Sequence, residues 1–255
     1  MASAVAGEAA EKITGTAEVA VGQQFPDRTD LGMLASFAGA GEVNISLSER
    51  FNLEFEGRAS TVGTTSPYAQ AATVAHAFWR DPQTFAFGAF GGFASLEMAP
   101  QRGNMFLGGV EGQAYLGNLT LYAQAAAITA SQNSPGSWLH FGGYFARGAA
   151  RYFVTPMTRL QFDAQWTSFS NTDDWTNALI LAGTVEHQFA ATPFAGFANV
   201  RWDHLEHGGN RPLTATAVTF GIRAYFGAGS TLDNDRNGAT MDVLPMPILL
   251  GLNFG

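Results

Sequence analysis

Apolar and polar residues alternate with a period of two along most of the chain. Phe51, Leu53 and Phe55 are separated by single polar residues, and the same pattern recurs over 160–167 and 218–226. Successive side chains of a β-strand point to opposite faces, so each run predicts a strand with one apolar face and one polar face.

Twelve such runs can be counted, each followed by a connection rich in turn-forming residues. The expected strands cover residues 13–25, 33–48, 51–62, 70–80, 85–94, 105–117, 119–130, 138–154, 159–167, 178–189, 194–203 and 213–226. The long uncharged stretch from Gly112 to Ala146 does not predict a membrane-spanning helix. Polar residues interrupt it, and it breaks at Gly117-Asn118 and Pro135-Gly136.

The connections also alternate. Those after the even-numbered strands are tight, whereas those after the odd-numbered strands are longer and rich in Gly, Ser, Asn and Asp, for example 95–104, 131–137 and 204–212. An even number of antiparallel strands with short turns at one end and longer loops at the other is the plan of an outer-membrane barrel. The expected fold class is therefore all-β, an antiparallel up-and-down transmembrane β-barrel of about twelve strands with both termini periplasmic.

Three segments follow from this plan. The barrel covers 13–226, the N-terminal segment 1–12 precedes it, and a tail over 227–255 follows it. The tail has a polar beginning and an apolar end, which suits a plug for the lumen, an extra strand or a segment that docks on a partner. Residues 1–12 have neither the basic nor the apolar region of a signal peptide.

Composition supports a membrane location. Charged residues make up 13% of the chain and hydrophobic residues 46%, whereas an ordinary soluble domain has about 25% charged residues. A soluble all-β protein would also alternate, but it would have to bury the charged face or expose the apolar one. The net charge of −8 and the lack of a basic run exclude a nucleic-acid partner. With no cysteine, disulfides and zinc-thiolate sites are also excluded.

Charged residues at the polar positions of the strands are the candidate pore-lining residues. They are Glu18, Glu54, Glu56, Glu111, Arg147, Arg151, Asp163, Arg201 and Arg223. Acidic residues concentrate on early strands and basic residues on late ones, so the two groups would face each other across a lumen and bias which ions pass. The alternative is that neighbours pair and seal the lumen, Arg151 with Asp163 and Arg223 with Glu18.

The last strand carries the most specific motif. The segment 219–226 contains Thr219, Gly221, Ala224 and the terminal aromatic Phe226. It resembles the assembly signal of bacterial outer-membrane β-barrel proteins of the porin-like kind, except that 29 residues follow it here. The resemblance implies the outer membrane of a Gram-negative bacterium, contact with membrane lipid and lipopolysaccharide, recognition by the barrel-assembly machinery, and small solutes or ions as cargo. A homo-oligomer or a periplasmic partner is compatible with it.

Two polar segments are candidate metal sites. In the tail, Asp233, Asp235 and Asn237 have the spacing of the first half of a calcium loop, although Leu244 replaces the expected acidic ligand. A polar turn is the favoured explanation of this segment, so no cofactor is expected, and calcium is the one candidate. Residues 203–207 hold two His and two acidic residues in a predicted loop, but their spacing matches no zinc motif.

These observations predict a porin-like channel for passive diffusion of small hydrophilic solutes or ions, with selectivity set by the lumen Arg and Glu residues. A sealed barrel that anchors a partner through its loops or tail is the first alternative. A membrane-embedded lipid hydrolase is the second, although none of the five His has a Ser partner in a recognisable motif. The chain is therefore expected not to be an enzyme.

Overall fold

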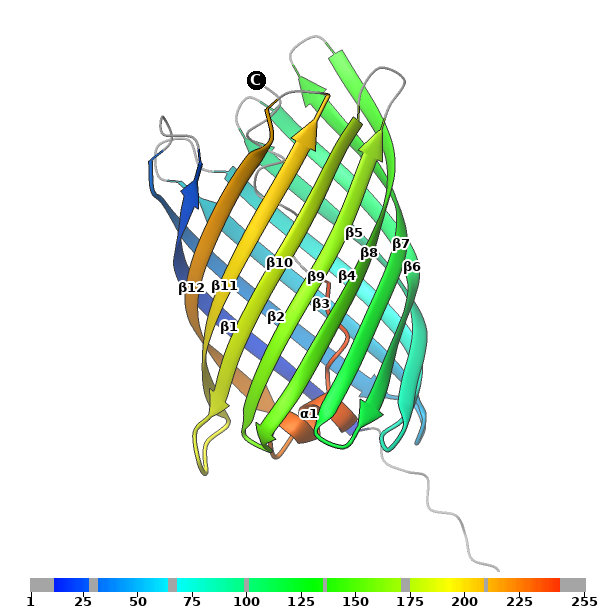
Figure 1. The fold of residues 1–255 in the computed structure, drawn as a ribbon. Coiled ribbons are helices and arrows are strands. Elements are labelled where there is room, and N and C mark those ends of the chain that lie inside the picture. Colours follow the sequence, from blue (N-terminus) through cyan, green and yellow to red (C-terminus); the bar gives the residue numbers. More distant parts are fainter. Residues whose placement is uncertain are drawn as a thin grey trace, which may run out of the picture.

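The computed structural model describes residues 12–27, 32–63, 68–98, 101–134, 137–170, 175–208 and 211–243, which form a closed antiparallel barrel and one short helix (Figure 1). The strands are β1 (Lys12–Pro26), β2 (Leu34–Ser46), β3 (Phe51–Val62), β4 (Tyr68–Asp81), β5 (Phe85–Met98), β6 (Gln101–Leu116), β7 (Leu119–Ser134), β8 (Ser137–Thr155), β9 (Thr158–Ser170), β10 (Trp175–Gln188), β11 (Phe194–His207) and β12 (Leu213–Phe226). The predicted all-β class, the antiparallel up-and-down barrel and its twelve strands are confirmed, and the periplasmic position of both termini stays a prediction.

Each strand pairs with its neighbours in sequence, and β1 pairs with β12 to close the barrel. The closing ladder runs without interruption from Gly15 opposite Phe226 to Pro26 opposite Ala215. Closure leaves no free sheet edge, which is the condition for strands to cross a membrane, because lipid cannot satisfy backbone hydrogen-bonding groups.

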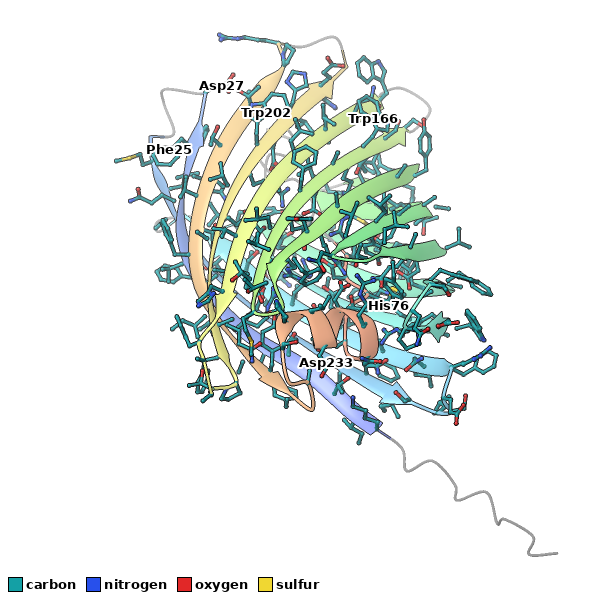
Figure 2. The ribbon with its side chains drawn as sticks, turned by 60° about the horizontal axis from the view of Figure 1, so that its bottom comes forward. Phe25, Asp27, His76, Trp166, Trp202 and Asp233 are labelled. Carbon is teal, nitrogen blue, oxygen red and sulfur yellow. The ribbon has the colours of Figure 1, made fainter. Side chains whose placement is uncertain are left out.

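The outer surface of the barrel is apolar. Val19, Phe37 and Phe220 are 66%, 58% and 59% exposed, and they point away from the lumen together with many other Phe, Val and Leu side chains. So much exposed apolar area is stable only against lipid. Trp166 and Trp202 lie near one rim of this surface (Figure 2), where aromatic side chains are typical of a membrane interface.

Three of the predicted long loops are shorter than expected. The predicted loops 95–104 and 131–137 lie mostly inside strands, because pairing continues through their Gly, Ser and Asn residues to the rim, and the first part of 204–212 extends β11 to His207. Residues 203–207 are accordingly the end of β11 rather than a loop. The strands hold 12 to 19 residues, against the 9–11 that cross a membrane, so their ends extend beyond the lipid.

One end of the barrel holds the tight connections 82–84, 117–118 and 156–157, and we call it the turn end; the opposite end is the loop end. At the turn end the chain leaves β12 through Gly227, whose φ of +75° favours glycine. It then forms helix α1 (Thr231–Asn237), which Ser230 caps by accepting a hydrogen bond from the Asp233 amide. Figures 1 and 2 show α1 across the turn end of the barrel. No helix in the described part of the chain is long and apolar enough to span a membrane.

Candidate functional site

The strands place all nine predicted pore-lining residues on the inner face of the barrel. Seven of them are almost completely buried inside the barrel, and Glu18 and Arg223 are partly exposed to the lumen. The alternation of side chains along each strand accounts for this placement. The structure thus brings together acidic residues from β1, β3 and β6 and basic residues from β8, β11 and β12.

On one side of the lumen these charges pair with each other along and across neighbouring strands. Arg223 Nε lies 2.8 Å from Glu18 Oε2, as the sequence predicted. Arg223 also donates to Glu186, which accepts a second hydrogen bond from Arg159 at 2.8 Å. On β11, Arg201 pairs with Asp203 two residues further along the strand, and on β3 Arg58 pairs in the same way with Glu56.

On the other side, the tail supplies the partners. Its segment 238–243 continues from α1 into the lumen, and Asp242 lies between two arginines of β8. Arg147 Nη2 is 3.1 Å from Asp242 Oδ2, and Arg151 Nη2 is 2.7 Å from Asp242 Oδ1. Each arginine therefore holds one oxygen of the same carboxylate, and charge-assisted hydrogen bonds of this kind are among the strongest in proteins.

The predicted pairing of Arg151 with Asp163 is wrong. Asp163 instead accepts two hydrogen bonds from Arg147, at 2.6 and 3.1 Å. Arg151 donates to Asp235 at 3.1 Å and to the carbonyl and hydroxyl oxygens of Thr240 at 3.0 and 2.8 Å. The tail thus supplies every acceptor with which Arg151 is seen to bond in the described structure.

Acidic residues of the wall bind the tail backbone. Glu54 accepts a hydrogen bond from the Thr240 amide and Glu56 accepts one from the Val243 amide, both at 3.0 Å. Gln113 donates to the Thr240 carbonyl oxygen at 3.2 Å. These contacts fix the main chain of the tail as well as its acidic side chains.

Sequence reasoning missed His76. Its Nδ1 lies 2.8 Å from Glu111 in the buried wall, and Glu111 also accepts hydrogen bonds from Tyr122 and Gln124. The alternation on β4 could have assigned His76 to the lumen, but the polar and apolar positions of this strand are less distinct than elsewhere. Figure 2 shows His76 near the turn end of the barrel.

The tail leaves a polar cavity of about 230 Å³ beside it. The cavity borders β1 to β4 and β8 to β12, and its charged lining residues are Glu18, Glu42, Arg58, Arg151, Arg159, Asp163, Arg201, Arg223 and Asp242. Towards the loop end the lining continues as Gln24, Ser36, Ser60 and Gln70. Small side chains such as Ala20 and Ala217 leave the space open.

Towards the loop end the inner wall becomes apolar. Val74, Leu107, Ile128, Phe145 and Leu205 are buried there in one cluster. Val243, the last described residue of the tail, belongs to the same cluster. The described tail therefore passes from a charged part of the lumen into an apolar part.

The four residues of the predicted assembly signal lie in β12. Thr219 and Gly221 are on the inner face, and Ala224 and Phe226 are on the outer face. A Cβ atom at position 221 would collide with the ring of Phe197 and lie 2.6 Å from the Val19 carbonyl oxygen, so only glycine fits without a shift. Recognition of the segment by assembly machinery stays a prediction.

The three calcium candidates lie in α1, where each of them has a partner within the protein. Asp233 accepts hydrogen bonds from the Gly229 amide and the Asn237 side chain, and Asp235 faces Arg151. Among the described residues, no group of three or more His, Cys, Asp or Glu side chains is arranged to hold a metal. Leu244 lies outside the described residues, and calcium binding stays a prediction.

The arginines also determine the charge state of Asp242. Burial alone would raise the pKa of this carboxyl group, but Arg147 and Arg151 outweigh the effect and hold its pKa well below its usual range. Asp242 is therefore ionised whenever the tail is bound in the lumen at neutral pH.

No protein-family model and no curated protein matches the sequence. Among solved structures, the barrel is similar to an outer membrane channel from Pseudomonas putida F1, with a TM-score of 0.59 and 14% identity over 85% of this chain and 96% of that one. It is also similar to the translocator domain of the autotransporter NalP from Neisseria meningitidis, with a TM-score of 0.53 and 12% identity over 84% and 88%. The chain therefore has the fold of outer-membrane β-barrel proteins, and its apolar exterior is that of a barrel embedded in an outer membrane.

Proposed function

We propose that this protein is a non-enzymatic, porin-like channel in the outer membrane of a Gram-negative bacterium. Small hydrophilic solutes or ions diffuse passively through the side of the lumen that the tail leaves open. The observation that carries this proposal is the polar cavity of about 230 Å³, lined by charges from both ends of the sequence. A sealed scaffold would have no need for such a space, since apolar side chains could fill it.

The charges around the cavity occur in pairs of opposite sign. Such a lining selects polar solutes over apolar ones and has no strong preference for cations or anions. Glu18 and Arg223 face the space as partners, and Arg58 and Arg201 each have an acidic neighbour on the same strand. A solute passing them meets alternating donors and acceptors, which favours hydrated polar molecules over apolar ones. The neighbour from Pseudomonas putida is described as an outer membrane channel, and its likeness supports the fold on which this proposal is built.

Single-channel recording in planar bilayers tests the proposal. The full chain should give steady currents, and Ala217→Trp should reduce them at least twofold because the indole fills the cavity. Ala198→Trp is the matched control, since residue 198 alternates with the cavity-lining residues 197 and 199 and so points outward. Absence of current from the full chain, or equal currents from both variants, would contradict a pathway through this cavity.

A sealed barrel that anchors a partner is the second candidate. Helix α1 lies across the turn end, where the Leu232 amide donates to the Pro156 carbonyl oxygen and Arg236 donates to the Gly117 carbonyl oxygen. These contacts fasten the tail to two turns of the barrel. If these contacts close the turn end completely, neither the unchanged protein nor the two Trp variants will conduct. A sealed scaffold would then explain the structure better than a channel.

A further inference from the structure

We propose that Arg147 and Arg151 form a carboxylate-binding site in the channel wall. Its resident ligand is Asp242 of the protein's own tail, and a small carboxylate-bearing solute competes for it and releases the tail. This inference rests on the proposed channel function, because it names the solute class that the channel handles and the event that widens it.

The geometry of the site is that of a receptor for a carboxylate. Two guanidinium groups approach one carboxylate from two sides, at 3.1 and 2.7 Å, and each takes a different oxygen. Both guanidinium groups lie over the ring of Tyr122, 5.3 and 5.1 Å from its centre, which holds them in position. Gln124 accepts a further hydrogen bond from Arg147 and restricts its orientation.

The acceptors of the two arginines show how their pairing would change if the tail left the lumen. Arg147 keeps Asp163, a residue of the wall, but the bonds of Arg151 go to Asp235, Thr240 and Asp242 of the tail. Arg151 is almost completely buried in the present state. Without the tail, Arg151 would lose every acceptor with which it is seen to bond, and its unpaired guanidinium group would attract an anion of similar shape.

The cavity gives a competing solute a place beside the site while the tail is bound. Arg151 and Asp242 both line it, and the Asp242 side chain is 21% exposed against 2% for Arg151, so a carboxylate that enters the cavity arrives beside their ion pair. The contact between Asp242 and Arg151 is therefore the first that it can replace. The solute and the tail are mutually exclusive ligands of the same two side chains, which links the presence of an anionic solute to a wider lumen.

The test uses the full chain with a protease site inserted after Ala228, where the flanking glycines are exposed. The protein is refolded, incorporated into detergent micelles and cut, so the barrel folds with its tail present. Retention of the fragment 229–255 is then followed by size-exclusion chromatography during titration with succinate. Sodium chloride at the same ionic strength is the reference, and glycerol is the uncharged reference.

Succinate should release half of the fragment at an ionic strength where sodium chloride releases less than a tenth. Asp242→Asn should lower the succinate concentration that releases half of the fragment at least fivefold. Asp233→Asn is the matched control, because it removes the same charge from the tail but its carboxylate contacts only the tail itself. Arg151→Gln should abolish the difference between succinate and chloride, whereas Arg102→Gln at the exposed rim should preserve it.

Three results would overturn the inference: equal release by chloride and succinate, spontaneous loss of the wild-type fragment without added anion, or identical behaviour of the two aspartate variants. Should Arg151→Gln fail to fold, the aspartate pair decides, because both changes lie in the tail. Planar-bilayer currents of the intact chain separate this inference from the proposed function. Currents without any succinate effect would refute the site alone, and succinate-dependent release without current would refute the channel alone.

Discussion

Arg223 of the last strand pairs with Glu18 of the first strand, directly opposite in the ladder that closes the barrel. The two residues are 205 positions apart in sequence, so their ion pair forms only when the barrel closes. Arg223 also bonds to Glu186, which joins the closing ladder to β10. This small network fixes the register in which the barrel closes.

We expect Arg223→Gln to reduce the free energy of unfolding by about 1–3 kcal/mol, because it leaves Glu18 without a cationic partner. Urea unfolding in micelles, followed by tryptophan fluorescence, measures the loss. A double-mutant cycle with Glu18→Gln should give a coupling energy of about 1 kcal/mol. Strictly additive effects of the two changes would show that the pair contributes nothing to closure.

Gly221 should be intolerant of even the smallest side chain. A methyl group there would collide with Phe197 and with the Val19 backbone, so Gly221→Ala should cost about 1–3 kcal/mol. Gly183→Ala on β10 is the control, because nothing lies within 4 Å of the added atom, and its effect should stay within about 0.5 kcal/mol. Equal stabilities of the two variants would contradict the observed approach of Phe197 to Gly221.

Binding of the tail should depend on pH through Asp242. Since Arg147 and Arg151 lower the pKa of the bound carboxyl group, the stabilisation is complete above the ordinary aspartate pKa of about 3.9 and is lost as the pH falls below it. Retention of the cut fragment should therefore be constant from about pH 8 to 5 and should weaken by up to about tenfold per unit below about pH 4.

Asp242→Asn should remove this dependence while lowering retention at neutral pH. Asp233→Asn should keep the wild-type profile, because its carboxylate has no arginine partner among the described residues. A wild-type profile that is flat down to pH 3 would show that the ionised form of Asp242 is not what the arginines bind.

The strands could be located from the sequence because polar and charged residues recur at inward positions and apolar residues recur at outward positions, which face lipid. Val19, Phe37 and Phe220 belong to the outer face by alternation alone, and Glu54 and Arg223 to the inner face. The same reasoning failed at 203–207, where polar residues suggested a loop. Beyond the membrane both faces of a strand meet water. Polar residues there are compatible with continued pairing between strands, so they do not mark the end of a strand.

The interior of the barrel was less predictable than its wall. Arg151 was expected to pair with Asp163, its near neighbour in the hairpin of β8 and β9, but two aspartates of the tail bind it instead. No periodicity relates residue 151 to residues 235 and 242. Such contacts depend on where the tail turns back after Gly227, which the pattern of strands does not specify.

The central claim is that the lumen conducts beside a tail that partly fills it. The most direct measurement is single-channel conductance of the full chain in a planar bilayer, recorded before and after cutting behind Ala228 and adding succinate. We expect a small, steady current from the intact protein and at least a twofold increase once the tail is released. Silence both before and after release of the tail would contradict the account and favour a sealed barrel.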